Sequence, residues 1–113
     1  MPILRKPKVL YWTAHSRGKM RFYGLSEARV RRVIHSPKRL EEGVAPKTVA
    51  MMQIAGSKKH PYEIWVMLQD IGTKRKVISA WRYPGLTKPR SEIALSFLRN
   101  EFSEFTESGG LKE

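Results

Sequence analysis

Cysteine is absent from this chain of 113 residues, and no run of about 18 apolar residues occurs in it. The first absence excludes disulfides, thiolate nucleophiles and cysteine-based zinc sites. The three histidines are not at ligand spacing, so we expect neither a metal site nor a cofactor. The second absence excludes a membrane-spanning helix, and the N-terminal residues lack the apolar core of a signal peptide. Composition therefore predicts a soluble, cytoplasmic protein whose residues 1–113 form a single domain.

Acidic residues are scarce in most of the chain. The protein has 22 Lys and Arg against 10 Asp and Glu, which gives a net charge of +12. Residues 1–90 contain 20 of the basic residues and only 5 of the acidic ones, whereas residues 91–113 have an acidic balance. Solubility requires a much smaller net charge than this. The excess favours a polyanionic partner, either RNA or DNA.

Two short helices are predicted near the N-terminus. Thr13 is a suitable N-cap for a helix over residues 14–23, and Gly24 can adopt the left-handed conformation that ends a helix. Ser26 is a suitable N-cap for a second helix, which Pro37 ends. Both helices are rich in Lys, Arg and His, and we expect them to expose a cationic surface.

The periodicity becomes typical of strands after a loop that begins at Lys38. Three strands separated by polar turns are predicted, over residues 47–55, 63–70 and 74–84. Both faces of these strands are partly apolar, so the pattern does not indicate which face meets the helices.

The predicted fold is α+β, with two N-terminal helices packed on a three- to four-stranded antiparallel sheet. Residues 13–84 are expected to form this helix–helix–sheet core, and residues 1–12 form either an arm or an edge strand. Residues 91–106 have a helical period with phenylalanines on one stripe, which predicts an amphipathic C-terminal helix that docks on the sheet or on a partner.

The stretch "AHSRGKMRFYGLSEARVRRVIHSP", followed by strands ending in "KVISAW", resembles a family of small prokaryotic proteins. Their helical pair reads H-A-x-x-R-M-x-x-R-G-I-S, with V-x-x-V-L-x-x-P at its end. The family looks related to the RelE/ParE and BrnT-type toxins of toxin–antitoxin modules. The resemblance covers about residues 13–82 and implies an antitoxin partner. It also implies RNA cleavage without a metal, in which basic residues assist attack by the ribose 2′-hydroxyl, although other members inhibit gyrase.

Three residues are candidates for catalysis: His15, Lys19 and Arg82. His15 could transfer a proton at neutral pH, but a histidine in a first helical turn could equally orient the helix pair. Trp81 and Tyr83 flank Arg82 and could stack on unpaired bases, although both could instead belong to the core. Further candidates for nucleic-acid contacts are the basic residues Arg17, Arg21, Arg29, Arg32, Lys74, Arg75 and Lys76.

The sequence thus leaves three functions open. The first is a RelE/BrnT-like toxin that acts as a metal-free ribonuclease. The second is an RNA- or DNA-binding module without catalytic activity. The third is a basic module that binds an acidic protein.

Overall fold

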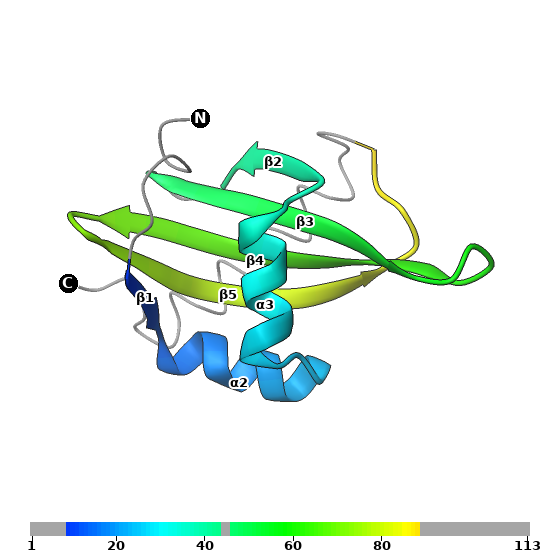
Figure 1. Cartoon of the computed structure of the whole chain (residues 1–113), viewed down its shortest axis with the longest axis horizontal. Helices are drawn as coiled ribbons and strands as arrows, with labels where there is room; N and C mark the ends of the chain where they lie inside the picture. The colour runs from blue at the N-terminus through cyan, green and yellow to red at the C-terminus, as the bar shows by residue number, and fades with distance from the viewer. Residues whose placement is uncertain (1–8, 44–45, 89–113) are drawn as a thin grey trace.

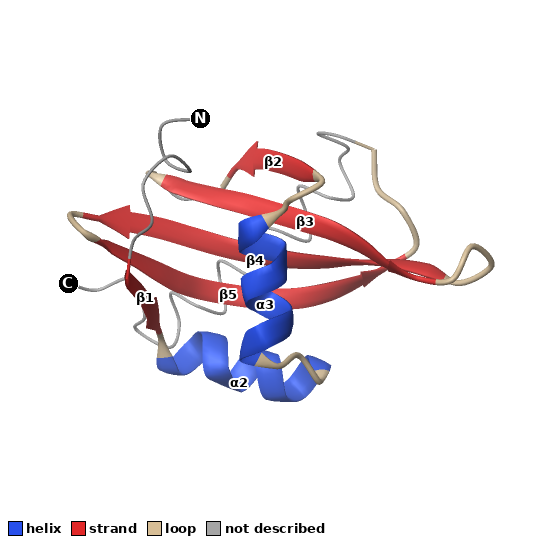
Figure 2. Cartoon of the chain, in the orientation of Figure 1, coloured by secondary structure: helices blue, strands red, loops and turns tan. Residues whose placement is uncertain are grey.

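The computed structural model of the chain describes residues 9–43 and 46–88, which form two helices and a mixed sheet (Figures 1 and 2). The elements in chain order are β1 (Val9–Trp12), α2 (Ala14–Tyr23), α3 (Glu27–His35), β2 (Arg39–Glu42), β3 (Thr48–Gly56), β4 (Pro61–Ile71) and β5 (Lys74–Pro84). The strands lie in the order β1-β5-β4-β3-β2. With 10 and 9 residues, neither helix described here is long enough to cross a bilayer.

Both helices begin and end where the sequence predicts. The Thr13 hydroxyl accepts a hydrogen bond of 3.0 Å from the Ser16 N–H at the start of α2. The Ser26 hydroxyl accepts one of 3.1 Å from the Arg29 N–H at the start of α3. Gly24 ends α2 with a φ of 68°, a left-handed conformation that glycine adopts without strain. The caps therefore confirm the local prediction for the helical pair.

The predicted sheet was wrong in the number and direction of its strands. Strands β3, β4 and β5 form the expected antiparallel meander, but β1 adds a parallel edge to β5, with Val9 opposite Lys74. The prediction of an antiparallel sheet rested on strands joined by hairpin turns, and β1 reaches β5 through no such turn. Residues 91–106, where a C-terminal helix was predicted, and residues 1–8 lie outside the described residues.

Strand β2 occupies part of the segment that was predicted to be a loop. Three of its four residues are charged, so it lacks the apolar alternation of a half-buried strand. Leu40 packs against the core on the helix side of the sheet. Arg39 and Glu41 point to the other side and pair with each other, Nε to Oε2, at 3.1 Å. An ion pair thus replaces an apolar pair on one face of this strand.

The helix side of the sheet holds the larger core. Helix α3 crosses β3 and β4, and α2 lies along β5 beyond the end of β1 (Figure 1). Val30 and Val33 of α3 are fully buried, and Met20 and Leu25 complete the helical contribution. They pack against the alternate residues Ile64, Val66 and Leu68 of β4 and against Val77 and Ala80 of β5. The helices therefore cover the face that carries Ile64 rather than the face that carries Trp65.

A second apolar cluster lies on the opposite face. The rings of Trp65 and Trp81 stack with centroids 6.0 Å apart and planes 3° from parallel. Both side chains are almost fully buried, together with Met52 and Met67. Tyr23, at the end of α2, packs against both clusters because α2 lies at the edge of β5. The sheet is therefore buried on both faces.

Candidate nucleic-acid interface

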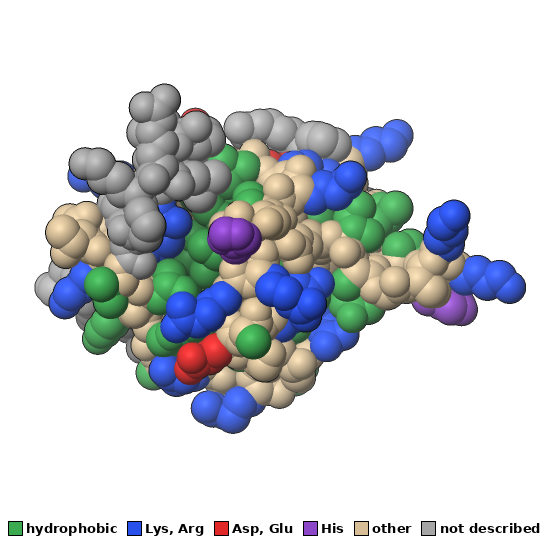
Figure 3. Space-filling model, viewed as in Figure 1, with side chains coloured by type: hydrophobic (Ala, Val, Ile, Leu, Met, Phe, Trp, Pro, Cys, Tyr) green, Lys and Arg blue, Asp and Glu red, His purple; other side chains and the backbone are tan. Residues whose placement is uncertain are grey.

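A row of side chains follows one face of helix α2. His15, Lys19 and Tyr23 are spaced by four residues, which places them on the same helical face. The Lys19 ammonium lies 5.2 Å from the centre of the Tyr23 ring. The helix contains three Lys and Arg residues and no acidic residue, and Figure 3 shows basic side chains over both helices. We call His15, Lys19 and Tyr23 the α2 row.

Arg82 meets the α2 row at the C-terminal end of the helix. Its Nε donates a hydrogen bond of 2.7 Å to the Tyr23 carbonyl, and its Nη2 donates one of 3.4 Å to the Gly24 carbonyl. Carbonyls at the end of a helix lack helical partners and carry the negative end of the helix dipole. The Arg82 guanidinium also lies 4.9 Å from the centre of the Tyr62 ring. Arg82 is therefore held in place without a carboxylate.

Helix geometry separates the catalytic candidates at the two ends of the α2 row. Eight residues at a rise of about 1.5 Å span roughly 12 Å between His15 and Tyr23. Lys19 lies between these ends, while Arg82 binds the backbone of Tyr23. His15 and Arg82 therefore do not converge on one point. The arrangement fits an extended polyanion better than a single phosphate.

Two further arginines approach Arg82 from helix α3. Arg29 Nη1 donates a hydrogen bond of 2.7 Å to Gln53 Oε1 on β3. Partial burial lowers the pKa of Arg29, and the positive charges of Arg32 and Arg82 lower it further, while Tyr62 acts in the opposite direction. Arginine nevertheless stays protonated in proteins at neutral pH. We call Arg29, Arg32 and Arg82 the arginine corner, in which the charges of the other two arginines repel that of Arg29.

Most carboxylates of the described residues are paired elsewhere. Arg17 pairs with Glu27 at 2.8 Å, and Arg75 pairs with Asp70 at 2.9 Å. Glu41 and Glu63 both lie within ion-pair distance of Arg39. Within residues 9–43 and 46–88, no carboxylate forms an ion pair with the arginine corner. An anion bound at this corner would relieve the repulsion among its guanidinium groups.

The basic residues predicted at the start of the third strand lie at the end of β5 away from Arg82. Lys74 and Arg82 are eight residues apart on β5, which corresponds to about 26 Å along a strand. Arg75 is only 5% exposed and is bonded to Asp70. Lys76 is half-buried beside it. The structure therefore places Arg82 near the C-terminal end of α2, whereas Lys74, Arg75 and Lys76 lie at the other end of β5, where the Thr13 N–H before α2 bonds to the Val77 carbonyl at 3.3 Å.

The most exposed aromatic side chain of the described residues is not one that the sequence suggested. Trp81 is 1% exposed and stacked on Trp65, and the half-buried Tyr83 packs against the same cluster. Phe22, by contrast, is 78% exposed. Sequence reasoning passed over it, although its spacing of three residues from Lys19 places it beside the α2 row. Phe22 thus differs from Trp81 and Tyr83 in its exposure to solvent, which residue type does not indicate.

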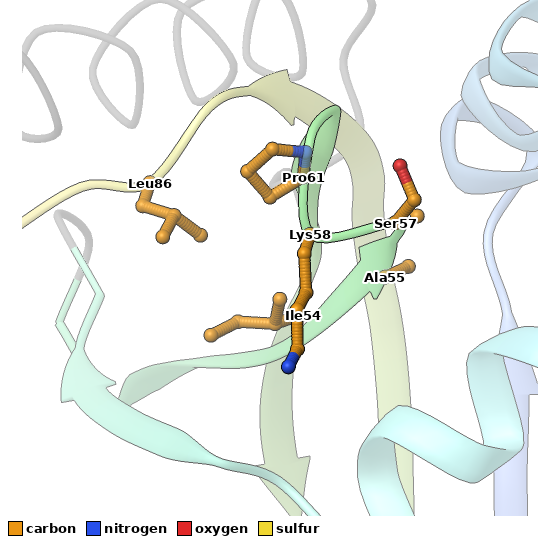
Figure 4. A pocket seen from close by; sticks show the side chains of 7 residues that line it. Ile54, Ala55, Ser57, Lys58, Pro61 and Leu86 are labelled. Atoms are coloured by element: carbon orange, nitrogen blue, oxygen red, sulfur yellow. The ribbon is translucent and has the colours of Figure 1, made fainter.

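An open pocket lies between the β3–β4 hairpin and the chain that follows β5 (Figure 4). Its volume is about 370 Å³, and Ile54, Pro61 and Leu86 line it together with Lys58. Ile54 shares a strand face with Met52, so the pocket is on the side of the sheet away from α3. The lining contains no histidine or carboxylate. The pocket is therefore separate from the α2 row.

Comparison with protein-family models, curated proteins and solved structures finds no match to this chain. Within the described part of the chain, no three His, Cys, Asp or Glu side chains lie close enough together to hold a metal ion. The function is therefore inferred from the side chains of the α2 row and the arginine corner.

Proposed function

We propose that the protein binds RNA along the α2 row and the arginine corner. The arginine corner carries the proposal, since the charges of Arg32 and Arg82 both act on Arg29, and no carboxylate of the described residues forms an ion pair with any of the three. Guanidinium groups bind phosphate with strong, charge-assisted hydrogen bonds. Lys19 of the α2 row extends this surface along α2, which packs on β5. RNA is preferred over DNA because the helical pair resembles that of the RelE/BrnT-type toxins.

Titration of RNA affinity against salt tests this proposal. Each phosphate contact made by a cation contributes about −0.7 to the log–log slope for a single strand. We expect Lys19→Ala and Arg29→Gln each to weaken binding of a single-stranded oligoribonucleotide and to make this slope less steep. Lys38→Ala removes one exposed charge outside the interface and serves as the matched control. Binding that does not depend on salt would refute the proposal, as would equal losses in all three variants.

RNA cleavage is a second candidate, favoured by the position of His15 one helical turn from Lys19 on the α2 row. In the reaction that we propose, the 2′-oxygen forms a bond to phosphorus while the bond from phosphorus to the 5′-oxygen breaks. A base takes the proton of the 2′-hydroxyl and an acid protonates the leaving 5′-oxygen. His15 can act in one of these roles, and Lys19 can stabilise the charge that develops on phosphate.

Incubation of RNA with the protein in the presence of EDTA tests cleavage separately from binding. We expect products with a 2′,3′-cyclic phosphate and a 5′-hydroxyl, and we expect His15→Ala to abolish them without a large loss of affinity. If the protein binds RNA but the RNA stays intact, cleavage is refuted and the protein is a non-catalytic binding module. Failure to bind RNA, together with tight binding to an acidic protein, would instead indicate a protein-interaction module.

A further inference from the structure

Phe22 is the most exposed of the large apolar side chains on the described residues, at 78%. Burying a phenylalanine stabilises a folded protein, and this ring forgoes most of that gain. An exposed apolar residue alone needs no explanation. Phe22, however, lies beside the α2 row, on a helix that carries three basic residues and no acidic one.

The Phe22 ring contacts two neighbouring side chains of α2. It meets the Tyr23 ring edge to face, with centroids 4.9 Å apart and planes at 86°. Tyr23 is itself anchored, since its ring packs against both cores and its carbonyl accepts the Arg82 hydrogen bond. The Lys19 ammonium lies 5.8 Å from the centre of the Phe22 ring. The exposed Phe22 ring therefore lies next to the Lys19 ammonium. Its contact with Tyr23 also connects it to Arg82 of the arginine corner.

We propose that Phe22 stacks on an unpaired nucleobase of single-stranded RNA while Lys19 and the arginine corner bind the adjacent phosphates. This inference rests on the proposed RNA binding and names the residue that selects single strands. Nucleic acid is the partner class in which a flat π-face and flanking negative charges occur together. Bases inside a duplex are already stacked on each other, so the ring has no base to contact there. A surface that binds an acidic protein segment would need positive charges but no exposed aromatic ring.

Two substitutions of Phe22 separate stacking from simple apolar contact. Phe22→Leu keeps an apolar side chain without a π-face, whereas Phe22→Tyr keeps the ring. The probes are a labelled ten-nucleotide single-stranded RNA and a duplex of the same sequence. Stacking of one base contributes about 1–3 kcal/mol, so Phe22→Leu should weaken single-strand binding at least about fivefold. Phe22→Tyr should bind within about twofold of the parent protein, and the affinity for the duplex should be unchanged by either substitution.

The salt dependence keeps this test apart from that of the proposed function. Since Phe22 is uncharged, Phe22→Leu should leave the log–log slope at the parent value, whereas Lys19→Ala should lower it. A parent protein that binds RNA with the expected slope, together with full single-strand affinity in Phe22→Leu, would overturn the base-stacking inference alone. Equal losses for single strand and duplex would also overturn it. Absence of salt-dependent binding by the parent protein would refute the proposed function itself.

Discussion

Arg39 and Arg82 both lie on aromatic rings, but their surroundings differ in charge. Arg39 lies 5.2 Å from the centre of the Trp65 ring, on the face of the sheet away from the helices. Its side chain is 16% exposed and lies near the carboxylates of Glu41 and Glu63. Arg82 lies 4.9 Å from the centre of the Tyr62 ring and bonds to backbone carbonyls instead. The charge of Arg39 is neutralised within the fold, whereas no carboxylate of the described residues forms an ion pair with Arg82.

The buried carboxylate of Glu63 organises the surroundings of Arg39. Glu63 is 1% exposed and accepts a hydrogen bond of 2.8 Å from Trp65 Nε1. It also accepts bonds from the N–H and the hydroxyl of Thr87, at 2.7 and 2.9 Å. Arg39 in turn donates to Thr87. This network ties the chain after β5 to β4 and β2, and it holds the charge of Arg39 next to two carboxylates.

The largest effect is expected from Glu63→Gln. The substitution retains the size of the side chain but removes a buried negative charge and brings an NH₂ group against the donors of Thr87. Breaking a buried ion pair by neutralising one partner costs about 3–5 kcal/mol. Urea denaturation should show a loss of that order in the free energy of unfolding. Glu42→Gln, on the exposed end of β2, is the matched control and should change this free energy by less than about 0.5 kcal/mol.

A loss below about 1 kcal/mol in Glu63→Gln would contradict the comparison. It would mean that Glu63 is not needed to neutralise the charge of Arg39. The environments of Arg39 and Arg82 would then differ less than their geometry indicates.

A smaller effect is expected from Arg82→Gln. The substitution removes the hydrogen bonds to the end of α2 and the contact with Tyr62. Arg82 is half-buried, and hydrogen bonds from a charged group contribute about 1.5–3 kcal/mol when well shielded. We therefore expect the free energy of unfolding to fall by about 1–2 kcal/mol. Thermal unfolding followed by far-UV circular dichroism measures this loss, and Arg82→Lys serves to separate charge from geometry.

Retention of full stability in Arg82→Gln, with RNA affinity reduced, would assign Arg82 to ligand binding alone. Stability lost in Arg82→Gln and unchanged RNA affinity per folded molecule would assign it to the fold alone and would weaken the proposed interface.

The helical pair was predictable because its signals are local. Thr13 and Ser26 each bond to a backbone N–H three residues away, and Gly24 supplies a conformation that few other residues adopt. The three long strands were also predictable from their composition. The side of the sheet that meets the helices was not, since the residues on both faces are apolar and both faces are buried.

The arginine corner could not be predicted because its contacts join distant parts of the chain. Arg29 and Gln53 are 24 residues apart, and Arg82 and Tyr23 are 59 residues apart. Sequence reasoning selected Arg82 for the aromatic residues next to it, yet alternation places Trp81 and Tyr83 on the opposite face of β5. The ring that does lie under Arg82 is Tyr62, from the neighbouring strand. Cross-strand pairing, which a single sequence does not specify, decided which aromatic residue accompanies each arginine.

The smallest effect on stability, and the sharpest separation of stability from binding, is expected from Arg29→Gln. Arg29 is the third residue of α3, and its N–H bonds to the hydroxyl of Ser26. Glu or Gln at this position can bond back to the N-cap residue, whereas a cation there opposes the helix dipole. Arg29 is also repelled by Arg32 and Arg82, and partial burial disfavours its charge. A position chosen for stability alone would not hold arginine.

Replacement of Arg29 by glutamine removes the unfavourable effects of the helix dipole, of charge repulsion and of partial burial. It also removes one hydrogen bond, of 2.7 Å to Gln53. The free energy of unfolding should therefore stay within about 0.5 kcal/mol of the parent value or rise. RNA affinity should fall, since one guanidinium of the arginine corner is lost. Urea denaturation and RNA titration on the same preparation measure both quantities. A destabilised Arg29→Gln protein with unchanged RNA affinity would show that Arg29 serves the fold, as Arg39 does, and would remove the contrast between the two sites.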